Sequence, residues 1–202
     1  MNLTMNSTTA KNLGGRYFTE TELGQAGFRQ LGRNVRVHER ASLYGLENIS
    51  LGDNVRIDDF SIIIATAAVA IGNHVSIPNF CFLGGKYGIA LEDFVTLAPG
   101  VKIFSASDDY SGEFLAGPTL PPDLTGGRRG KVILRRHVLL GAGTVVLPGC
   151  TIGEGVSVGA LSLVTRDLPE WSIYAGIPCR RLHARSRSLL KLEAQLPSRK
   201  LV

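Results

Sequence analysis

The chain has 202 residues, 44% hydrophobic and 19% charged, a composition typical of one globular domain rather than a disordered chain. Its formal net charge of +5 suits a small phosphorylated ligand as well as nucleic acid, so charge alone selects neither. No stretch approaches 18 uninterrupted apolar residues, and the N-terminus lacks the apolar run of a signal peptide. We therefore expect a cytoplasmic protein without stable membrane insertion.

Residues 1–30 form an N-terminal segment that precedes any regular repeat. Within it, "FTETELGQAGF" places Thr19 and Glu22 three residues apart, the spacing of a capping box. The segment therefore predicts a short helix before the first repeat.

From residue 31 onward, aliphatic residues recur every six positions. The phrases "LGRNV" at 31, "LGDNV" at 51 and "IGNHV" at 71 mark a longer regular period, in which two extra residues follow every third aliphatic. After residue 134 these extra residues are absent and the spacing is six throughout. A helix needs apolar spacing near 3.6 and an ordinary strand needs two, so a period of six fits neither.

This period predicts an all-β fold, a left-handed parallel β-helix, which is a triangular hexapeptide-repeat solenoid. Large aliphatic residues fill its interior, smaller ones lie near the corners, and left-handed turn residues stand three places after each aliphatic. The turn residues expected from this spacing are Asn34, Asn54, Gly143, Gly149 and Gly155. We assign residues 31–182 to the β-helix.

Residues 104–131 leave the hexapeptide register and form a long excursion loop. Loops of this length are uncommon in compact domains unless they are functional or disordered. The loop carries two adjacent acids, Asp108 and Asp109, in "SDDYSG". Since Ser, Asp and Gly are also turn-forming residues, a purely structural loop is the competing interpretation.

Residues 183–202 form a C-terminal tail in which "ARSRSLLKLEAQL" predicts a short amphipathic basic helix. Short helices at both ends would cover a solenoid whose terminal coils otherwise expose strand edges. The three cysteines share no metal-ligand spacing, and their odd number argues against a disulfide framework.

The phrases "GAGTVVLPGCTIGEG", "GALSLVTRDLP" and "AGIPCRRL" resemble the C-terminal half of hexapeptide-repeat acetyltransferases, including the galactoside, maltose and surface-polysaccharide enzymes. Members of that superfamily are typically homotrimers that bind acetyl-CoA in a cleft between neighbouring prisms. The resemblance spans about residues 30–182 and implies an acetyl-CoA-dependent enzyme. It also implies a homotrimer, to which a solenoid is suited because its flat faces allow three prisms to pack around a three-fold axis.

The resemblance also implies which residues bind the cofactor. Backbone at two pairs of small residues would line the pantetheine channel, and a threonine with two arginines would meet the adenine and phosphate end. The residues concerned are Gly141, Ala142, Gly159, Ala160, Thr165, Arg166 and Arg180. The competing interpretation is that the glycines only form turns and the arginines are solvated.

In the related sugar enzymes, the excursion loop embraces the acceptor and carries a histidine as general base. Alignment of "IFSASDD" with that motif places Asp108 at the position of the histidine. We expect Asp108 or Asp109 to act as the base or to orient an amine; water or the substrate itself are the alternatives. Ser107 and Tyr110 of the loop, and Asn79 of "IPNFCF", are expected to contact the acceptor. For the oxyanion, we expect a backbone N–H near Ala98 or Gly141.

The predicted function is acetyl transfer to a hydroxyl or amine of a sugar or nucleotide-sugar, directly within a ternary complex, in lipopolysaccharide or O-antigen synthesis. A longer acyl donor and either O- or N-transfer remain open. The alternative is a non-catalytic β-helix protein that has lost the catalytic histidine.

Metal and nucleic-acid functions are disfavoured. His74 and His137 occupy turn positions, so the three-histidine zinc site of carbonic anhydrases with this fold is not expected. The basic clusters lack interleaved aromatic residues, which disfavours a nucleic-acid partner.

Overall fold

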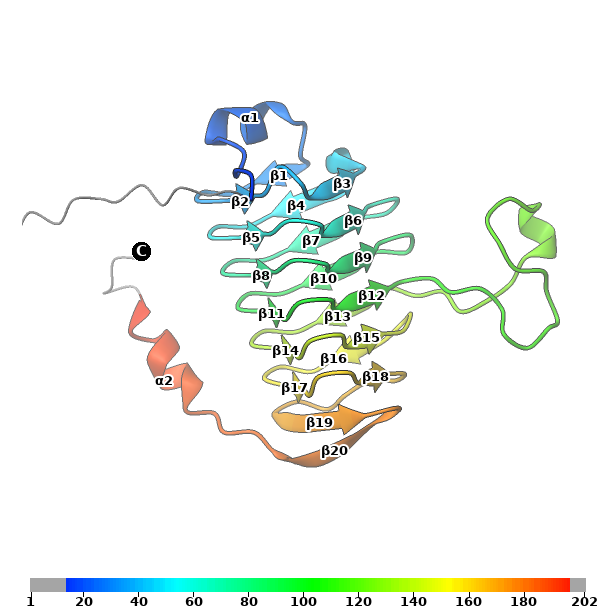
Figure 1. Ribbon diagram of the computed structural model, residues 1–202. Coiled ribbons are helices and arrows are strands. Elements are labelled where there is room, and N and C mark those ends of the chain that lie inside the picture. Colours follow the sequence, from blue (N-terminus) through cyan, green and yellow to red (C-terminus); the bar gives the residue numbers. More distant parts are fainter. Residues whose placement is uncertain (1–13, 197–202) are drawn as a thin grey trace, which may run out of the picture.

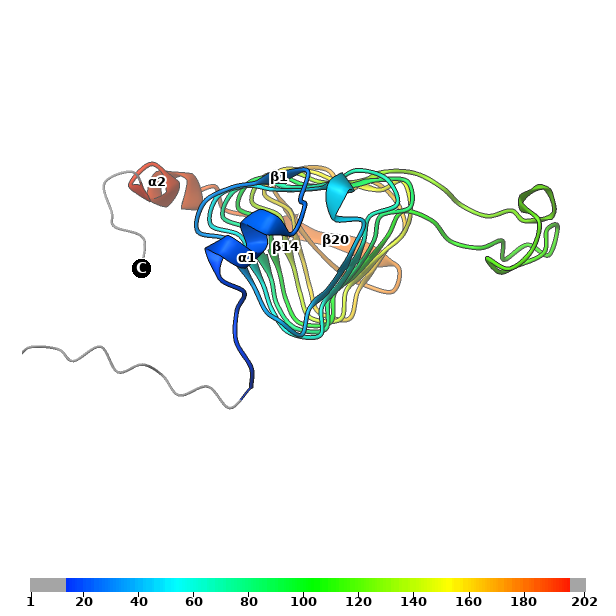
Figure 2. The ribbon, with the colours of Figure 1, turned by 90° about the horizontal axis from the view of Figure 1, so that it is seen from above.

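The protein is a three-sided parallel β-solenoid, seen in a computed structural model that describes residues 14–196 (Figure 1). Viewed along its axis, the coils superpose as a triangle (Figure 2). We call the three sheets the first, second and third faces, in the order in which the chain meets them. The predicted β-helix is confirmed.

Two of the faces contain six strands each, and the second face contains eight. The first face consists of β1 (Gln30–Leu31), β4 (Ile49–Leu51), β7 (Val69–Ile71), β10 (Ile89–Leu91), β13 (Val132–Leu134) and β16 (Thr151–Ile152). The second consists of β2 (Arg36–Val37), β5 (Arg56–Ile57), β8 (Ser76–Ile77), β11 (Thr96–Leu97), β14 (Leu139–Leu140), β17 (Ser157–Val158), β19 (Ser172–Gly176) and β20 (Cys179–Ala184). The third consists of β3 (Ser42–Tyr44), β6 (Ile62–Ile64), β9 (Phe82–Gly84), β12 (Lys102–Phe104), β15 (Val145–Val146) and β18 (Leu163–Val164).

The strand register explains the sequence period. Leu83 pairs with Ile63 on the coil before it and with Ile103 on the coil after it, an equal step along the chain in each direction. Beyond the excursion loop, Val146 pairs with Val164, a shorter step that equals three plain hexapeptides. Every aliphatic of the pattern therefore returns to the same face one coil later, where it fills the interior: Ile57, Ile77, Leu97 and Leu140 are at most 2% exposed.

The corners are made by residues in the left-handed conformation. We name them first corner (between the first and second faces), second corner (between the second and third) and third corner (from the third face to the next coil). All five predicted turn residues have φ between 54° and 77°: Asn34, Asn54, Gly143, Gly149 and Gly155.

Both histidines at turn positions are stacked in a ladder along the first corner. His74 and His137 have φ of 56° and 59°, and the Phe94 ring lies between them at centroid distances of 4.9 and 5.0 Å. Their rings therefore extend a corner ladder, which confirms their role as turn residues.

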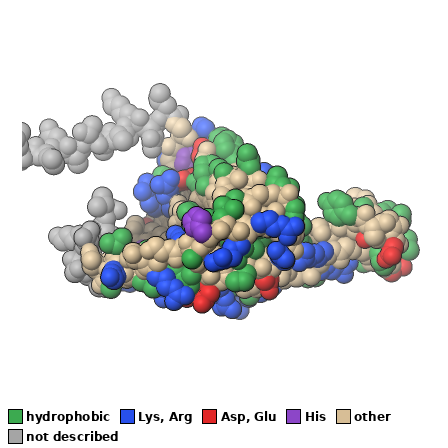
Figure 3. Space-filling model, turned by 90° about the horizontal axis from the view of Figure 1, so that it is seen from below, with side chains coloured by type: hydrophobic (Ala, Val, Ile, Leu, Met, Phe, Trp, Pro, Cys, Tyr) green, Lys and Arg blue, Asp and Glu red, His purple; other side chains and the backbone are tan. Residues whose placement is uncertain are grey.

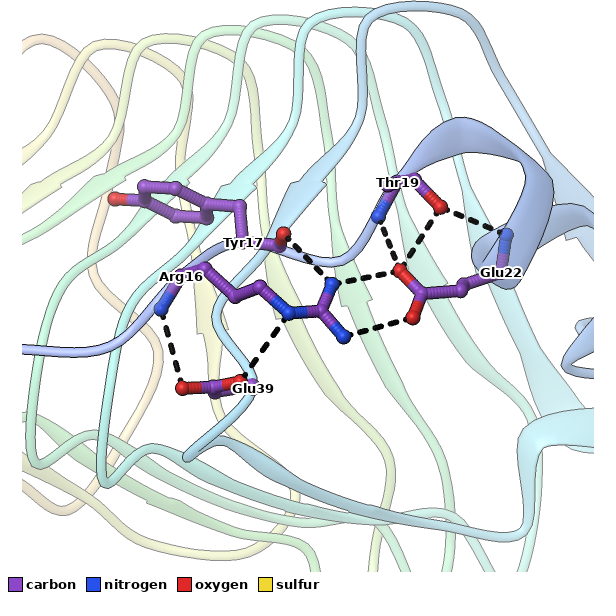
Figure 4. A network of polar contacts seen from close by, with 5 residues as sticks. All are labelled: Arg16, Tyr17, Thr19, Glu22 and Glu39. Atoms are coloured by element: carbon purple, nitrogen blue, oxygen red, sulfur yellow. Dashed lines mark hydrogen bonds and ion pairs between the residues drawn. The ribbon is translucent and has the colours of Figure 1, made fainter. Parts of the chain in front are cut away.

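The N-terminal helix α1 (Glu20–Gln25) begins with the predicted capping box. Figure 4 shows Thr19 Oγ1 accepting from the Glu22 N–H at 3.2 Å, while Glu22 accepts from the Thr19 N–H at 2.7 Å. Arg16 also donates to both Glu22 carboxylate oxygens at 2.8 Å. Hydrogen bonds from Arg16 and then Thr19 lower the pKa of Glu22 to about 2, so the Glu22 carboxylate stays ionised across the physiological pH range.

The C-terminal tail turns back along the first corner and ends in the predicted short helix, α2 (Leu189–Glu193). The Arg185 guanidinium donates to the His137 carbonyl at 2.8 Å and to the Gly155 carbonyl at 3.1 Å. Glu193 accepts from Arg136 and contacts His137 Nε2 at 2.8 Å. No helix within residues 14–196 is long and apolar enough to cross a membrane.

Candidate active site

The residues expected to line the cofactor channel are stacked on successive coils of the second corner. The Gly141 N–H donates to the Val158 carbonyl, and the Leu161 N–H to the Ala142 carbonyl, both at 2.8 Å. A Cβ at Gly141 would lie 2.5 Å from the Ala160 nitrogen, so only glycine fits between these coils. Both pairs of small residues therefore present bare backbone at one corner, which an extended ligand can approach.

The expected oxyanion donors are already engaged in this ladder. The Ala98 N–H donates to the Leu140 carbonyl at 2.8 Å, as the Gly141 N–H does to Val158. Neither can turn toward a ligand without breaking the coil, so a donor near Ala98 or Gly141 would have to be a neighbouring N–H. The neighbouring N–H of Ala142, an exposed residue, donates to no acceptor within residues 14–196.

The excursion loop leaves from the third corner and extends well beyond the solenoid (Figures 1 and 2). Its stem is ordered by pairing: Ala106 and Arg129 form an antiparallel bridge, and the Ser107 N–H donates to the Arg128 carbonyl at 2.9 Å. At its base, the buried Ser105 hydroxyl donates to the Gly84 carbonyl at 2.7 Å. Residues 105–107 and 128–130 therefore form a fixed stalk that carries the acidic residues outward.

The two acids of the loop differ sharply in their surroundings. The Asp109 carboxylate accepts from the Ser111 hydroxyl and the Gly112 N–H at 2.8 Å, and from the Glu113 N–H at 3.1 Å. Hydrogen bonding, first from Ser111, lowers the pKa of Asp109. Asp109 thus caps a turn and has a lowered pKa, which makes it the weaker candidate of the two for the base, and its catalytic role stays a prediction.

Asp108 directly follows the stalk residue Ser107 and is exposed. Its carboxylate makes no hydrogen bond or ion pair within residues 14–196. Ser107 is half-buried in the stalk, and Tyr110 is 93% exposed. Of the four predicted loop residues, Asp108 and Tyr110 are therefore the two whose side chains are free to meet a ligand.

Asn79 and the excursion loop lie apart within one chain. Asn79 lies at the second corner, shortly before β9, whereas the loop begins after β12. Because β9 and β12 run parallel with Phe82 opposite Lys102 and Gly84 opposite Phe104, the two sites lie at opposite edges of the third face. The loop continues outward from its own edge (Figure 2), so a site using both needs a second copy of the chain.

The expected phosphate-binding residues lie at the C-terminal end of the solenoid, where Lys and Arg side chains are spread over the body and the base of the loop (Figure 3). Burial raises the pKa of the Cys179 thiol while Arg166 and Arg180 lower it, so both guanidinium groups lie near this one thiol. Both arginines are exposed, and neither has a carboxylate partner in the described part of the chain.

The Thr165 carbonyl accepts from Arg128 Nη1 at 2.9 Å, while the expected contact of Thr165 with the cofactor stays a prediction. This bond ties the loop stem to the last coil. Sequence reasoning missed Arg128, although "GGRRGK" at the end of the loop marked a basic, glycine-rich hinge.

Gly127 lies directly before the stalk residue Arg128, at a position with no room for a side chain. A Cβ there would lie 2.1 Å from the Ser107 carbonyl oxygen, and φ is +123°. We expect Gly127→Ala to displace Asp108 and to lower turnover about tenfold or more, with the unfolding midpoint nearly unchanged, because the β-helix core lies elsewhere. Gly117→Ala is the matched control, since φ is +119° but nothing lies within 4 Å. Equal turnover of the two variants would contradict a positioning role for the stem.

No group of three His, Cys, Asp or Glu side chains within residues 14–196 is arranged to hold a metal ion. His38 is buried at the second corner, and His183 Nδ1 lies 2.9 Å from the Ala184 carbonyl.

Comparisons with known proteins agree with this architecture. Residues 131–166 match the family described as bacterial transferase hexapeptide (six repeats). The chain is 36% identical to dTDP-4-amino-4,6-dideoxy-D-glucose acyltransferase of Escherichia coli over 179 residues, which cover 88% of this chain and 93% of that protein.

Two solved structures of AntD, an N-acyltransferase from Bacillus cereus, are similar over 91% of this chain. One, with an aspartate replaced by alanine and with dTDP and coenzyme A bound, has a TM-score of 0.87, 39% identity and 98% coverage of its own chain. The other, with dTDP and 3-hydroxybutyryl-CoA bound, has a TM-score of 0.79, 37% identity and 97% coverage.

Proposed function

Because the chain belongs to the hexapeptide-repeat sugar acyltransferases, we propose that it transfers an acyl group from an acyl-CoA to the amino group of a nucleotide-linked sugar. The chain is an acyltransferase, since relatives 36–39% identical over most of its length are acyltransferases. The alternative of a non-catalytic β-helix protein is therefore set aside. The choice of an amine over a hydroxyl is supported by the relatives, which are named for an amino sugar and for N-acyl transfer.

The observation that carries the proposal is the bare backbone of the second corner. Gly141 and Gly159 leave an open strip on consecutive coils, and the unpaired Ala142 N–H lies within it. A pantetheine arm along this strip would bring the thioester toward Ala142, whose N–H we propose as the oxyanion donor. Arg166 and Arg180 at the C-terminal end are proposed to bind the phosphates of coenzyme A.

In the proposed reaction, the amine nitrogen attacks the thioester carbonyl carbon, and the N–C bond forms as the C–S bond breaks. The amine proton passes to the Asp108 carboxylate, and coenzyme A leaves as a thiolate. An amine needs less help than a hydroxyl, so one correctly placed carboxylate replaces the histidine of the related sugar enzymes. No covalent acyl-enzyme is required.

We propose a homotrimer in which the loop of one copy reaches the second corner of its neighbour. The separation of Asp108 from Asn79 within one chain supports this, as do the exposed side chains of Tyr44, Ile62 and Ile64 on the third face. A contiguous apolar patch of this kind typically marks an interface. Sedimentation equilibrium should give a trimer mass, and a monomer at micromolar concentration would contradict it.

We propose acetyl-CoA as one donor and keep longer acyl-CoA donors open. The proposed place of action is the cytoplasm, and the proposed use of the product is surface-polysaccharide synthesis, as in lipopolysaccharide or O-antigen.

Release of free thiol from acetyl-CoA tests the acceptor class. Purified protein would be assayed with hexoses, free amino sugars and nucleotide-linked amino sugars at equal concentration. We expect turnover with the nucleotide-linked amino sugars at least about tenfold faster than with the others, because binding energy from the nucleotide contributes to catalysis. Faster turnover of a simple hexose would contradict the proposal.

A further inference from the structure

Two phenylalanine rings are stacked on the outside of the second corner. Phe60 and Phe80 lie one coil apart, with ring centroids 5.4 Å apart and planes 10° from parallel. Their side chains are 46% and 57% exposed. The Arg40 guanidinium lies 5.9 Å from the Phe60 centroid, on the side of the first coil. The result is an exposed Arg–Phe–Phe stack that runs along the solenoid axis.

The fold itself does not call for aromatic rings at these positions. Phe60 and Phe80 have φ of 57° and 61°, a conformation that bulky residues rarely adopt. On later coils, Gly100 and Gly143 make the same corner with φ of 74° and 68°. Two phenylalanines thus occupy strained positions without burying their rings, a combination that points to function.

Among residues 14–196, no ring or guanidinium group is stacked on the face of the Phe80 ring that points away from Phe60. Arg40 covers Phe60 from above, and Phe60 covers one side of Phe80. On the next coil, the Gly100 N–H donates to the Asn79 carbonyl at 3.2 Å, and Gly100 has no side chain to cover Phe80. The uncovered ring face therefore looks toward the coil of Ala98 and the strip proposed for the donor.

We propose that the Phe60–Phe80 pair is a stacking platform for the pyrimidine base of a nucleotide-linked acceptor, which adds a third layer to the stack on Phe80. Flat aromatic bases stack on exposed aromatic side chains, and a guanidinium at the far end strengthens such a stack. The inference rests on the proposed function in taking the acceptor to be nucleotide-linked.

Packing against a second copy is the competing explanation, because the apolar third face begins beside this corner. The two explanations can be distinguished by the side-chain shape that each requires. A subunit contact requires apolar volume, which leucine supplies, whereas a base requires a flat aromatic face. Leu161 shows that leucine fits this corner, since it makes the same corner on a later coil with φ of 54°.

The test measures binding of dTDP, inorganic pyrophosphate and coenzyme A by calorimetry to the full chain. We expect Phe80→Leu to weaken dTDP binding about tenfold. Phe60→Leu should have a smaller effect, because the Phe60 ring would reach the base only through Phe80. Phe80→Tyr keeps the aromatic face and should restore binding. Pyrophosphate and coenzyme A affinities, and the sedimentation mass, should not change. Phe94→Leu is the control, because Phe94 is a stacked aromatic residue in the same left-handed conformation at another corner.

Unchanged dTDP affinity in Phe80→Leu would overturn the inference, and so would an equal loss of coenzyme A binding or a change in mass. The proposed function fails separately. A wild-type protein that acylates a free amino sugar but does not bind dTDP overturns the platform and keeps the acyltransferase. A protein whose dTDP binding needs Phe80 but which acylates no amine keeps the platform and overturns the proposed function.

Discussion

Replacing Asp108 by asparagine should lower kcat for acyl transfer about 100-fold or more while leaving the affinities for coenzyme A and dTDP unchanged. Asparagine has nearly the shape of aspartate but cannot take the amine proton, and general-base catalysis is typically worth about 10²–10⁴-fold. The stem that carries Asp108 is fixed by backbone pairing between Ser107 and Arg128, so the substitution should not displace the loop. Single-turnover thiol release with saturating substrates measures the chemical step.

Asp109→Asn is the matched control for this prediction. Its side-chain oxygen can still accept from Ser111 and from the Gly112 N–H, so the turn should survive. We expect turnover within about threefold of the wild type. If the two variants lose activity equally, or if Asp108→Asn retains full turnover, then Asp108 is not the base.

The second large effect is expected from removing both arginines at the C-terminal end. Arg166→Ala combined with Arg180→Ala should weaken coenzyme A binding by roughly 10–100-fold, because each hydrogen bond to a charged phosphate is worth about 1.5–3 kcal/mol. The affinity for dTDP should not change, since these residues lie far along the solenoid from the second-corner residues Phe60 and Phe80.

A second ligand shows which phosphate is bound. If the arginines bind the 3′-phosphate, dephospho-coenzyme A should bind wild type and variant with similar affinity. If they bind the diphosphate instead, both ligands should weaken in parallel. Arg33→Ala, at the opposite end of the solenoid, is the charge control. A double variant that binds coenzyme A as tightly as the Arg33 variant would contradict the assignment.

The coil architecture could be predicted from sequence because it depends on one local rule. A six-residue period puts an aliphatic inside at each step, and the same period fixes where left-handed residues must stand, as Asn54 and Gly143 do. The capping box of Thr19 and Glu22 is likewise local, and it is present as expected.

The site was less predictable because it depends on the direction in which the loop leaves the solenoid. It also depends on which backbone N–H groups are already hydrogen-bonded between coils. Periodicity places Asn79 after a second-face strand and Asp108 after a third-face strand on the next coil, but it does not say in which direction the loop leaves its corner. The Ala98 N–H looked available, yet parallel pairing with the next coil consumes it. Asp109 is the instructive case, because "DYSG" is an Asp-initiated turn sequence and its capping role was readable from turn chemistry.

The stacked rings of Phe60 and Phe80 also have a signal in the sequence, which the six-residue period of aliphatic residues does not reveal. They stand at the same position of consecutive repeats, where later coils carry glycine or leucine. An aromatic residue at a turn position whose ring stays exposed, as in Phe60 and Phe80, is a local inconsistency, and such inconsistencies are expected at functional sites.

The most direct test is to identify the product formed from acetyl-CoA and dTDP-4-amino-4,6-dideoxyglucose. The wild-type protein should release one thiol for each sugar converted, and NMR spectroscopy should show the acetyl group as an amide on the sugar nitrogen. Asp108→Asn should form the same amide far more slowly. Thiol release without an acylated sugar, or an ester at a hydroxyl with the amine left free, would contradict acyl transfer to a nucleotide-linked amine.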